Sequence, residues 1–404
     1  MAQQKPAATR IELPKARPEI VRYNRVHYGL YFGGTAWEFL GLGLGVRFGT
    51  GALLRRRAER LTKLRPQKGT PRNRRLGRIR LRRILRSRFV QAGIVFAGFS
   101  ALMLIWRIPL QFLSYQVERA YGFATLGPAL WFSDRLLAYV FGLVRIPIVW
   151  LGFMLVERAP RSWWLILWAF CIPWTLAMTV LNPVLFDPAY NRFQPLQNPG
   201  LEKRLLELAQ KAGIPNATVL VADYSKRTTK VNAYVTGIGP SARMVIWDTT
   251  LAAMSEDEIV AIMGHEIGHY KLNHVWWSFV GGVGAAFGIL WVLSRLYPWA
   301  VQRFGRGIRS PHDLAALPLA IFLLTLMLFL QTPLEAAYSR HQERQADRYG
   351  LELTRMPEAT ARAFIAFVDR NYADPDPPPF IVLWFYSHPP LRERVASALR
   401  YRAE

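Results

Sequence analysis

The chain has 404 residues, of which 51% are hydrophobic and 13% aromatic, and it carries a formal net charge of +25. Its apolar residues gather in long runs, a distribution that indicates a membrane protein rather than a set of soluble domains. The single cysteine, Cys171, excludes an intrachain disulfide and any cysteine-based metal site. The N-terminus, from Met1 to Arg25, lacks the apolar core of a signal peptide, so we expect the spans themselves to direct insertion.

Much of the positive charge lies in one block. Between Arg55 and Arg88 there are sixteen Lys or Arg residues and one acid, Glu59, which together contribute +15. Such a block can bind RNA or anionic lipid, or it can be a basic loop that joins two spans along the lipid headgroups. Aromatic side chains that would stack on bases are absent from the block. We therefore expect a basic loop and no nucleic-acid partner; the alternative is a non-catalytic membrane scaffold that recruits RNA or anionic lipid.

Apolar segments long enough to cross a membrane as helices predict a polytopic, mainly α-helical protein with about six spans. The first is the weakest, because it is glycine-rich and carries Glu38 and Arg47. Charged groups at membrane depth face protein or water, so these charges suggest an enclosed polar chamber. An alternative class of protein with such charges is a transporter or channel. The predicted spans are 28–54, 89–112, 136–156, 163–186, 275–298 and 314–335.

A polar region of strands and helices separates the fourth span from the fifth. Leu201–Gly213 has helical periodicity and ends in a Gly-Ile-Pro stop signal. Three β-like runs follow, Ala217–Ala222, Val231–Thr236 and Met244–Asp248, before the chain turns helical again. This order is typical of a small zincin-like metallopeptidase domain. The predicted domains are 1–186, with four spans and the basic loop at 55–88, and 187–404, a zinc metallopeptidase domain interrupted by a two-span hairpin at 275–335.

The motif His265-Glu266-Ile267-Gly268-His269 carries the chemistry. On a helix, residues four apart lie on one face, so both imidazoles can bind one zinc ion while Glu266 takes a proton from water. The simpler interpretation is a buried helix with two hydrogen-bonded histidines.

Zinc needs a further protein ligand, and Glu343 is the candidate. The hairpin of the fifth and sixth spans returns the chain to the same membrane face, which can bring Glu343 to the zinc helix. Asp347, one turn later, can accept a hydrogen bond from a liganding imidazole. The alternative for Glu343 alone is a solvated surface glutamate.

These motifs and the flanking spans resemble the type I CAAX prenyl endopeptidases, which are integral-membrane gluzincin zinc metalloproteases. The resemblance covers the chain from the second predicted span onward. Further matching segments are Asn182–Phe186, Asn191–Leu196, Asp223–Arg227, Asn232–Gly237 and Tyr386–Pro390 with Arg394.

The resemblance implies one Zn²⁺ per chain, bound by His265, His269 and Glu343, with Glu266 as the general base. It also implies that Asn232 and Ala233 pair with an extended substrate, that His388 stabilises the oxyanion, and that Arg394 contributes to substrate binding.

The resemblance further implies a peptide or protein substrate, in this family a prenylated C-terminus, and a zinc site on the cytoplasmic face. In a bacterium the protein would lie in the plasma membrane. The positive-inside rule places the loop 55–88 in the cytoplasm instead, which puts the zinc site outside if all six spans cross. Sequence alone leaves these two orientations open.

Overall fold

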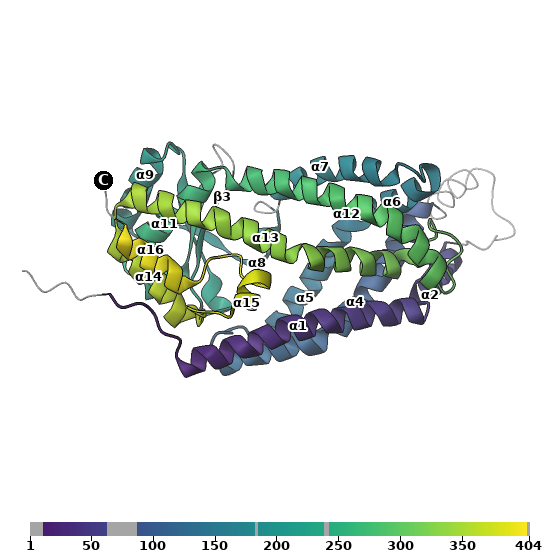
Figure 1. The fold of residues 1–404 in the computed structure, drawn as a ribbon, viewed down its shortest axis with the longest axis horizontal. Coiled ribbons are helices and arrows are strands. Elements are labelled where there is room, and N and C mark those ends of the chain that lie inside the picture. The colour runs from purple at the N-terminus through teal and green to yellow at the C-terminus, as the bar shows by residue number, and fades with distance from the viewer. Residues whose placement is uncertain (1–10, 63–86, 182–184, 238–241, 402–404) are drawn as a thin grey trace, which may run out of the picture.

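The computed structural model describes residues 11–62, 87–181, 185–237 and 242–401, so most of the basic block lies outside the described residues. The molecule is elongated (Figure 1), with long helices along its length and a small sheet with shorter helices at one end. This arrangement separates a membrane part from a polar part.

The N-terminal half forms a set of long helices. The first predicted span ends early, because Gly49 adopts a left-handed conformation with φ 62° and separates α1 from α2. The 3₁₀ turn Leu143–Arg145 joins α5 to α6. The helices are α1 Pro18–Arg47, α2 Thr50–Leu61, α4 Arg88–Ala120, α5 Pro128–Gly142, α6 Ile146–Arg158 and α7 Trp163–Leu181.

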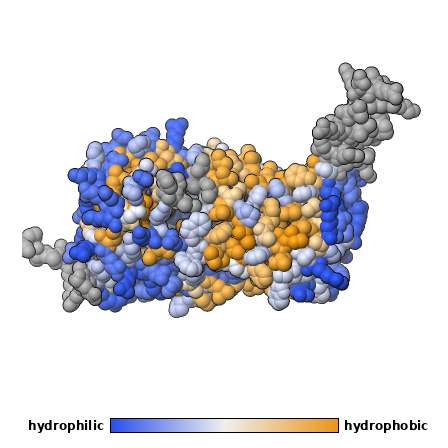
Figure 2. Space-filling model, turned by 90° about the horizontal axis from the view of Figure 1, so that it is seen from above, coloured by the Kyte–Doolittle hydropathy of each residue, from blue (hydrophilic) through white to orange (hydrophobic). Residues whose placement is uncertain are grey.

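Within the described residues, four helical segments are long and apolar enough to cross a membrane: Arg88–Ala120, Pro128–Arg158, His274–Phe304 and Leu314–Thr354. This is fewer than the six predicted spans. The fourth predicted span is a shorter apolar helix, Trp163–Thr179, and the first, in α1, is diluted by its charged residues. Figure 2 shows an apolar belt between two hydrophilic ends, as expected for a protein that spans a bilayer.

Glu38, one of the charges in the first predicted span, pairs with an arginine on α4. The Nε atom of Arg107 on α4 donates to a carboxylate oxygen of Glu38 on α1 over 2.6 Å, and a second guanidinium nitrogen contacts the other oxygen. The bidentate pair neutralises both charges and fixes α1 against α4.

The polar part contains a four-stranded sheet in the order β1-β2-β4-β3. All three predicted strands are present, and β2 pairs in parallel with β4 while β3 pairs antiparallel to β4. The extra strand β1 has three residues, too few for a recognisable alternation. The strands are β1 Phe193–Pro195, β2 Thr218–Ala222, β3 Ala233–Thr236 and β4 Arg243–Trp247.

Helices cover this sheet and connect it to the membrane part. The predicted helix at 201–213 is α9, capped by the side chain of Asn198 and ended by Gly213 with φ 78°. The HExxH helix α11 does not run directly into α12, because Asn273, with φ 58°, interrupts the chain between them. The helices are α8 Asp187–Tyr190, α9 Pro199–Lys211, α10 Asp248–Ala253, α11 Glu256–Lys271, α12 His274–Phe304, α13 Leu317–Thr354, α14 Pro357–Asn371, α15 Pro379–Trp384 and α16 Leu391–Arg400.

Polar contacts join the membrane helices to the sheet domain. Lys230 Nζ lies 2.9 Å from a carboxylate oxygen of Glu118 on α4, and the Tyr23 hydroxyl on α1 donates to Glu118 over 2.6 Å. Arg227 forms a bidentate pair with Asp134 on α5 at 2.9 and 3.0 Å. These contacts hold the sheet domain on the ends of the helices.

Candidate active site

The HExxH helix, α11, is fixed at its N-terminus and along one face. Ser255 and Glu258 form a reciprocal capping box that satisfies the first backbone N–H groups. Ile259, Met263 and Ile267 recur every four residues and are almost fully buried against the sheet core. The histidine face of α11 is thereby turned away from the sheet core and toward α13.

Small residues allow α11 and α13 to approach closely. A Cβ atom added at Gly264 would lie 2.4 Å from the Thr354 side chain, and one added at Gly268 would lie 3.1 Å from the Ala346 carbonyl oxygen. On α13, a Cβ atom at Gly350 would lie 2.8 Å from the His265 backbone nitrogen. This close crossing brings Glu343 to the two histidines.

We expect Gly350→Ala to weaken metal binding although Gly350 is not a candidate ligand. Overpacking costs about 1–3 kcal/mol and forces α13 away from α11, so zinc affinity and thermal stability should both fall. The matched control is Gly284→Ala on α12, where an added Cβ meets nothing within 4 Å and alanine favours the helix by about 1 kcal/mol. Metal content and melting temperature of the two detergent-purified variants test this. Unchanged zinc affinity in Gly350→Ala would disprove the close-packing argument.

Three donor atoms converge on one point between α11 and α13. His265 Nε2 and His269 Nε2 are 3.1 Å apart. His265 Nε2 lies 3.3 Å from Oε2 of Glu343, and His269 Nε2 lies 3.3 Å from Oε1 of the same carboxylate. One ligand atom from each of the three residues lies within 4.8 Å of the other two, so the three side chains can hold one zinc ion.

The Glu343 carboxylate supports the same conclusion. It is buried, with His265 Nε2 3.3 Å and an Arg394 guanidinium nitrogen 3.6 Å from its Oε2 atom. A buried carboxylate is energetically costly unless cations compensate its charge, and a metal bound between Glu343 and the two histidines would add to that compensation. The residues present thus fit a bound divalent metal.

Hydrogen bonds fix the tautomers of both histidines. Asp347 accepts from His265 Nδ1 over 2.8 Å, which leaves the Nε2 lone pair for the metal. His269 Nδ1 lies 3.0 Å from His274 Nδ1, and His274 Nε2 lies 3.1 Å from Gln345 Oε1. The Gln345 oxygen can only accept, so His274 Nε2 donates to it. Neutral His274 then accepts at Nδ1 from His269 Nδ1, and the His269 Nε2 lone pair is left for the metal.

Arg394 is buried beside the cluster and contacts its carboxylates. Its buried guanidinium donates to both Asp347 oxygens, at 2.6 and 2.8 Å, and lies 3.6 Å from Glu343 Oε2. The observed contacts orient Asp347, and the substrate contact implied by the family stays a prediction.

Glu266 and His388 line a pocket of about 520 Å³ together with the three converging residues. Burial raises the pKa of Glu266, although the two neighbouring histidines oppose it. The His388 side chain lines the pocket and is 54% exposed, and its Nε2 atom lies 3.3 Å from a Glu343 oxygen. Partial burial lowers the pKa of His388 to about 4, although the Glu343 carboxylate opposes this shift. The pocket thus holds a carboxylate suited to accept a proton and a neutral imidazole that can donate a hydrogen bond.

The predicted substrate-pairing residues lie at the start of β3, an edge strand of the sheet. The Asn232 side-chain oxygen accepts from the Ala233 backbone N–H over 2.9 Å, while the Asn232 carbonyl accepts from Thr250 and Trp247. The other edge of β3 is not covered by a strand among the described residues, so it can accept an extended peptide.

Zinc binding should depend on pH because a proton competes for the same atoms. Burial lowers the pKa of His265, but hydrogen bonds to Asp347 and Glu343 outweigh burial and raise it to about 10. His265 without a metal therefore carries an extra proton at neutral pH, which a metal must displace. We expect zinc affinity to rise roughly tenfold per pH unit between about pH 6 and about pH 8. Chelator competition measures it; an affinity independent of pH would contradict this protonation.

The fold and the site define a multi-pass integral membrane metalloprotease. Residues 195–403 match Peptidase family M48, and residues 72–192 match the CAAX prenyl protease N-terminal domain, which has five membrane helices. The chain belongs to peptidase family M48.

Similar proteins include two of known sequence and one of known structure. The uncharacterized metalloprotease YhfN of Bacillus subtilis (strain 168) is 37% identical over 319 residues, covering 77% of this chain and 74% of that protein. CAAX prenyl protease 1 of Saccharomyces cerevisiae is 32% identical over 342 residues, covering 78% and 73%. The crystal structure of S. mikatae Ste24p shares the fold, with a TM-score of 0.76 and 23% identity over 94% of this chain and 87% of that one.

Proposed function

We propose that the protein is a zinc metalloendopeptidase that hydrolyses peptide bonds in membrane-associated substrates, and that His265, His269 and Glu343 hold the zinc ion. The observation that carries the proposal is that one ligand atom from each of the three residues lies within 4.8 Å of the other two, beside Glu266 in one pocket. Asp347 keeps His265 in the liganding tautomer.

We assign proton transfer to Glu266 and stabilisation of the oxyanion to His388. Bound zinc supplies Lewis acidity, which lowers the pKa of water and polarises a carbonyl. Glu266 takes a proton from the attacking water and passes it to the leaving amine, a role that its raised pKa suits. His388 is neutral at physiological pH, and it donates an N–H to the oxyanion that develops on the scissile carbonyl.

The walls of the pocket support a lipid-bearing substrate. Leu176 from α7 and Trp276 and Phe279 from α12 line the pocket together with the polar cluster, so a lipid attached to the peptide has an apolar surface to lie on. CAAX prenyl protease 1 is among the relatives, and we propose a prenylated C-terminal peptide that pairs with the edge of β3 at Asn232 and Ala233.

We propose, from the family resemblance, that the site faces the cytoplasm. The positive-inside rule favours the reverse, because the arginine-bearing helix α2 and the end of α12 lie at the opposite end of the molecule (Figure 1). A single cysteine at the exposed Lys203 of α9, with Cys171 replaced by Ala, decides between them. Labelling of intact cells by a membrane-impermeant thiol reagent would overturn the cytoplasmic placement.

Cleavage of a quenched prenylated peptide and of its unprenylated twin by detergent-purified protein tests the function. We expect cleavage that a chelator abolishes and zinc restores, with the prenylated peptide preferred. Equal cleavage of both peptides would show that the lipid does not contribute to substrate specificity. Zinc binding without cleavage of either peptide would refute the proposed substrate class, and activity unaffected by chelation would refute the metal mechanism.

A further inference from the structure

A second pocket, of about 740 Å³, lies at the end of the membrane helices remote from the metal cluster. It is lined by the last turns of α1 and α12 and the first turns of α13. From His274 at the cluster to Trp299 at this pocket, α12 rises roughly 40 Å. Because of this separation, the pocket cannot be part of the peptidase site.

Three arginines give the pocket a strong positive charge. They are Arg47 on α1, Arg303 on α12 and Arg306 just after it. Among the described residues none of the three forms an ion pair with a carboxylate; Arg303 instead lies 5.4 Å from the centroid of the Phe304 ring. The three side chains line one pocket, and an anion bound in it would reduce the repulsion among their like charges.

Nearby carboxylates are already occupied. Asp313 pairs with the buried Arg55, and Glu59 pairs with Arg309 at 3.2 Å. The 63–86 segment contains eleven Lys or Arg residues and no Asp or Glu. Neither of these two carboxylates is therefore available to neutralise the arginines of the pocket.

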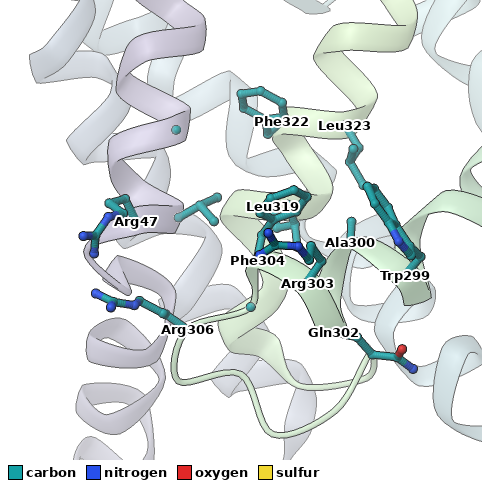
Figure 3. Close-up of a pocket in the computed structure, with 13 residues that line it drawn as sticks. Arg47, Trp299, Ala300, Gln302, Arg303, Phe304, Arg306, Leu319, Phe322 and Leu323 are labelled. Atoms are coloured by element: carbon teal, nitrogen blue, oxygen red, sulfur yellow. The ribbon is translucent and has the colours of Figure 1, made fainter.

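Apart from Gln302, the other side chains that line the pocket are apolar. Leu319, Phe322 and Leu323 of α13 form one wall, and Figure 3 shows Phe322 and Leu323 above the level of the arginines. Trp299 lines the pocket and is 57% exposed, as tryptophan commonly is where hydrocarbon meets headgroups. At this end of the molecule the apolar belt meets a hydrophilic cap (Figure 2). The pocket thus combines three arginines with an apolar wall at a membrane interface.

We propose that this pocket binds an anionic glycerophospholipid. The headgroup phosphate lies among the guanidinium groups of Arg47, Arg303 and Arg306, whose planar N–H forks match phosphate oxygens. The acyl chains lie along Phe322 and Leu323. A free phosphate would leave the apolar wall uncovered, whereas one phospholipid satisfies both the charge and the wall.

Native mass spectrometry of the full chain, released from detergent with phosphatidylglycerol or phosphatidylcholine added, tests the site. The variant is the triple change Arg47→Gln, Arg303→Gln and Arg306→Gln. One basic residue near a membrane is worth about fivefold in affinity for anionic lipid, so the triple variant should lose at least about tenfold in bound phosphatidylglycerol.

The matched control makes the same change in charge at the same end of the molecule. Arg56, Arg57 and Arg60 are exposed on α2, do not line the pocket and can all be changed to Gln. We expect this control to retain phosphatidylglycerol within about twofold of the parent. An equal loss in both triple variants would overturn the proposal, because binding would then depend on overall charge rather than on the pocket.

A second measurement uses the unaltered protein and does not depend on a variant that folds. Phosphatidylglycerol with a photoreactive group on one acyl chain should label the α13 peptide that contains Leu319–Leu323. Competition by inorganic phosphate alone should leave this labelling unchanged. Labelling elsewhere, or loss of labelling to inorganic phosphate, would overturn the lipid assignment, and the latter would make the pocket a site for the free anion.

Discussion

Glu266→Gln should retain zinc and lose between about 10²- and 10⁴-fold in turnover. The amide keeps the size of the side chain but cannot accept a proton from water, and general acid–base catalysis contributes about that factor. Glu266 lines the pocket without being one of the three converging ligand atoms, so metal content should not change. Single-turnover cleavage of the peptide, with metal analysis of the same sample, measures both quantities.

The control for this substitution is Glu256→Gln in the first turn of the same helix. Glu256 is exposed and pairs with Arg204 at the surface, an interaction that contributes little to stability. Its activity should match that of the parent protein. Activity in Glu266→Gln close to that of Glu256→Gln would show that another group accepts the proton.

Sequence patterns predicted the architecture of the sheet domain well. The three strands and the helix after Asn198 are present because alternation, capping residues and a Gly-Ile-Pro stop are local signals that tertiary contacts did not override. The first span was predicted poorly. Its apolar run continues through Gly49, and only the left-handed conformation of that glycine shows where α1 ends.

The predicted site residues mostly come together. The HExxH spacing places His265 and His269 within 3.1 Å of each other, and the hairpin topology brings Glu343 to both. Substrate binding by Arg394 stays a prediction, because the structure shows only that its guanidinium donates to Asp347. An arginine shortly after a Pro-Pro turn gives no sequence signal of which way it points.

Two supporting features were missed. Gln345 accepts a hydrogen bond from His274. The only feature of the sequence that pointed to such a partner was His274 itself, which follows the HExxH helix. Gly350 allows α13 to cross α11 closely, and it could have been found as a small residue two turns beyond Glu343 on the same helical face. Both depend on contacts between segments distant in sequence, which periodicity within one helix does not report.

Glu343→Ala should lose the metal itself, in contrast to the loss of turnover alone in Glu266→Gln. Removing a residue that merely supports a ligand costs about 10–100-fold in metal affinity, so removing one of three ligands should cost more than about 100-fold. His265 would keep Asp347, and the fold should persist. Glu335→Ala, an exposed glutamate on the same helix, is the matched control and should bind zinc normally. Full zinc occupancy in Glu343→Ala would remove Glu343 from the ligand set and leave its buried carboxylate unexplained.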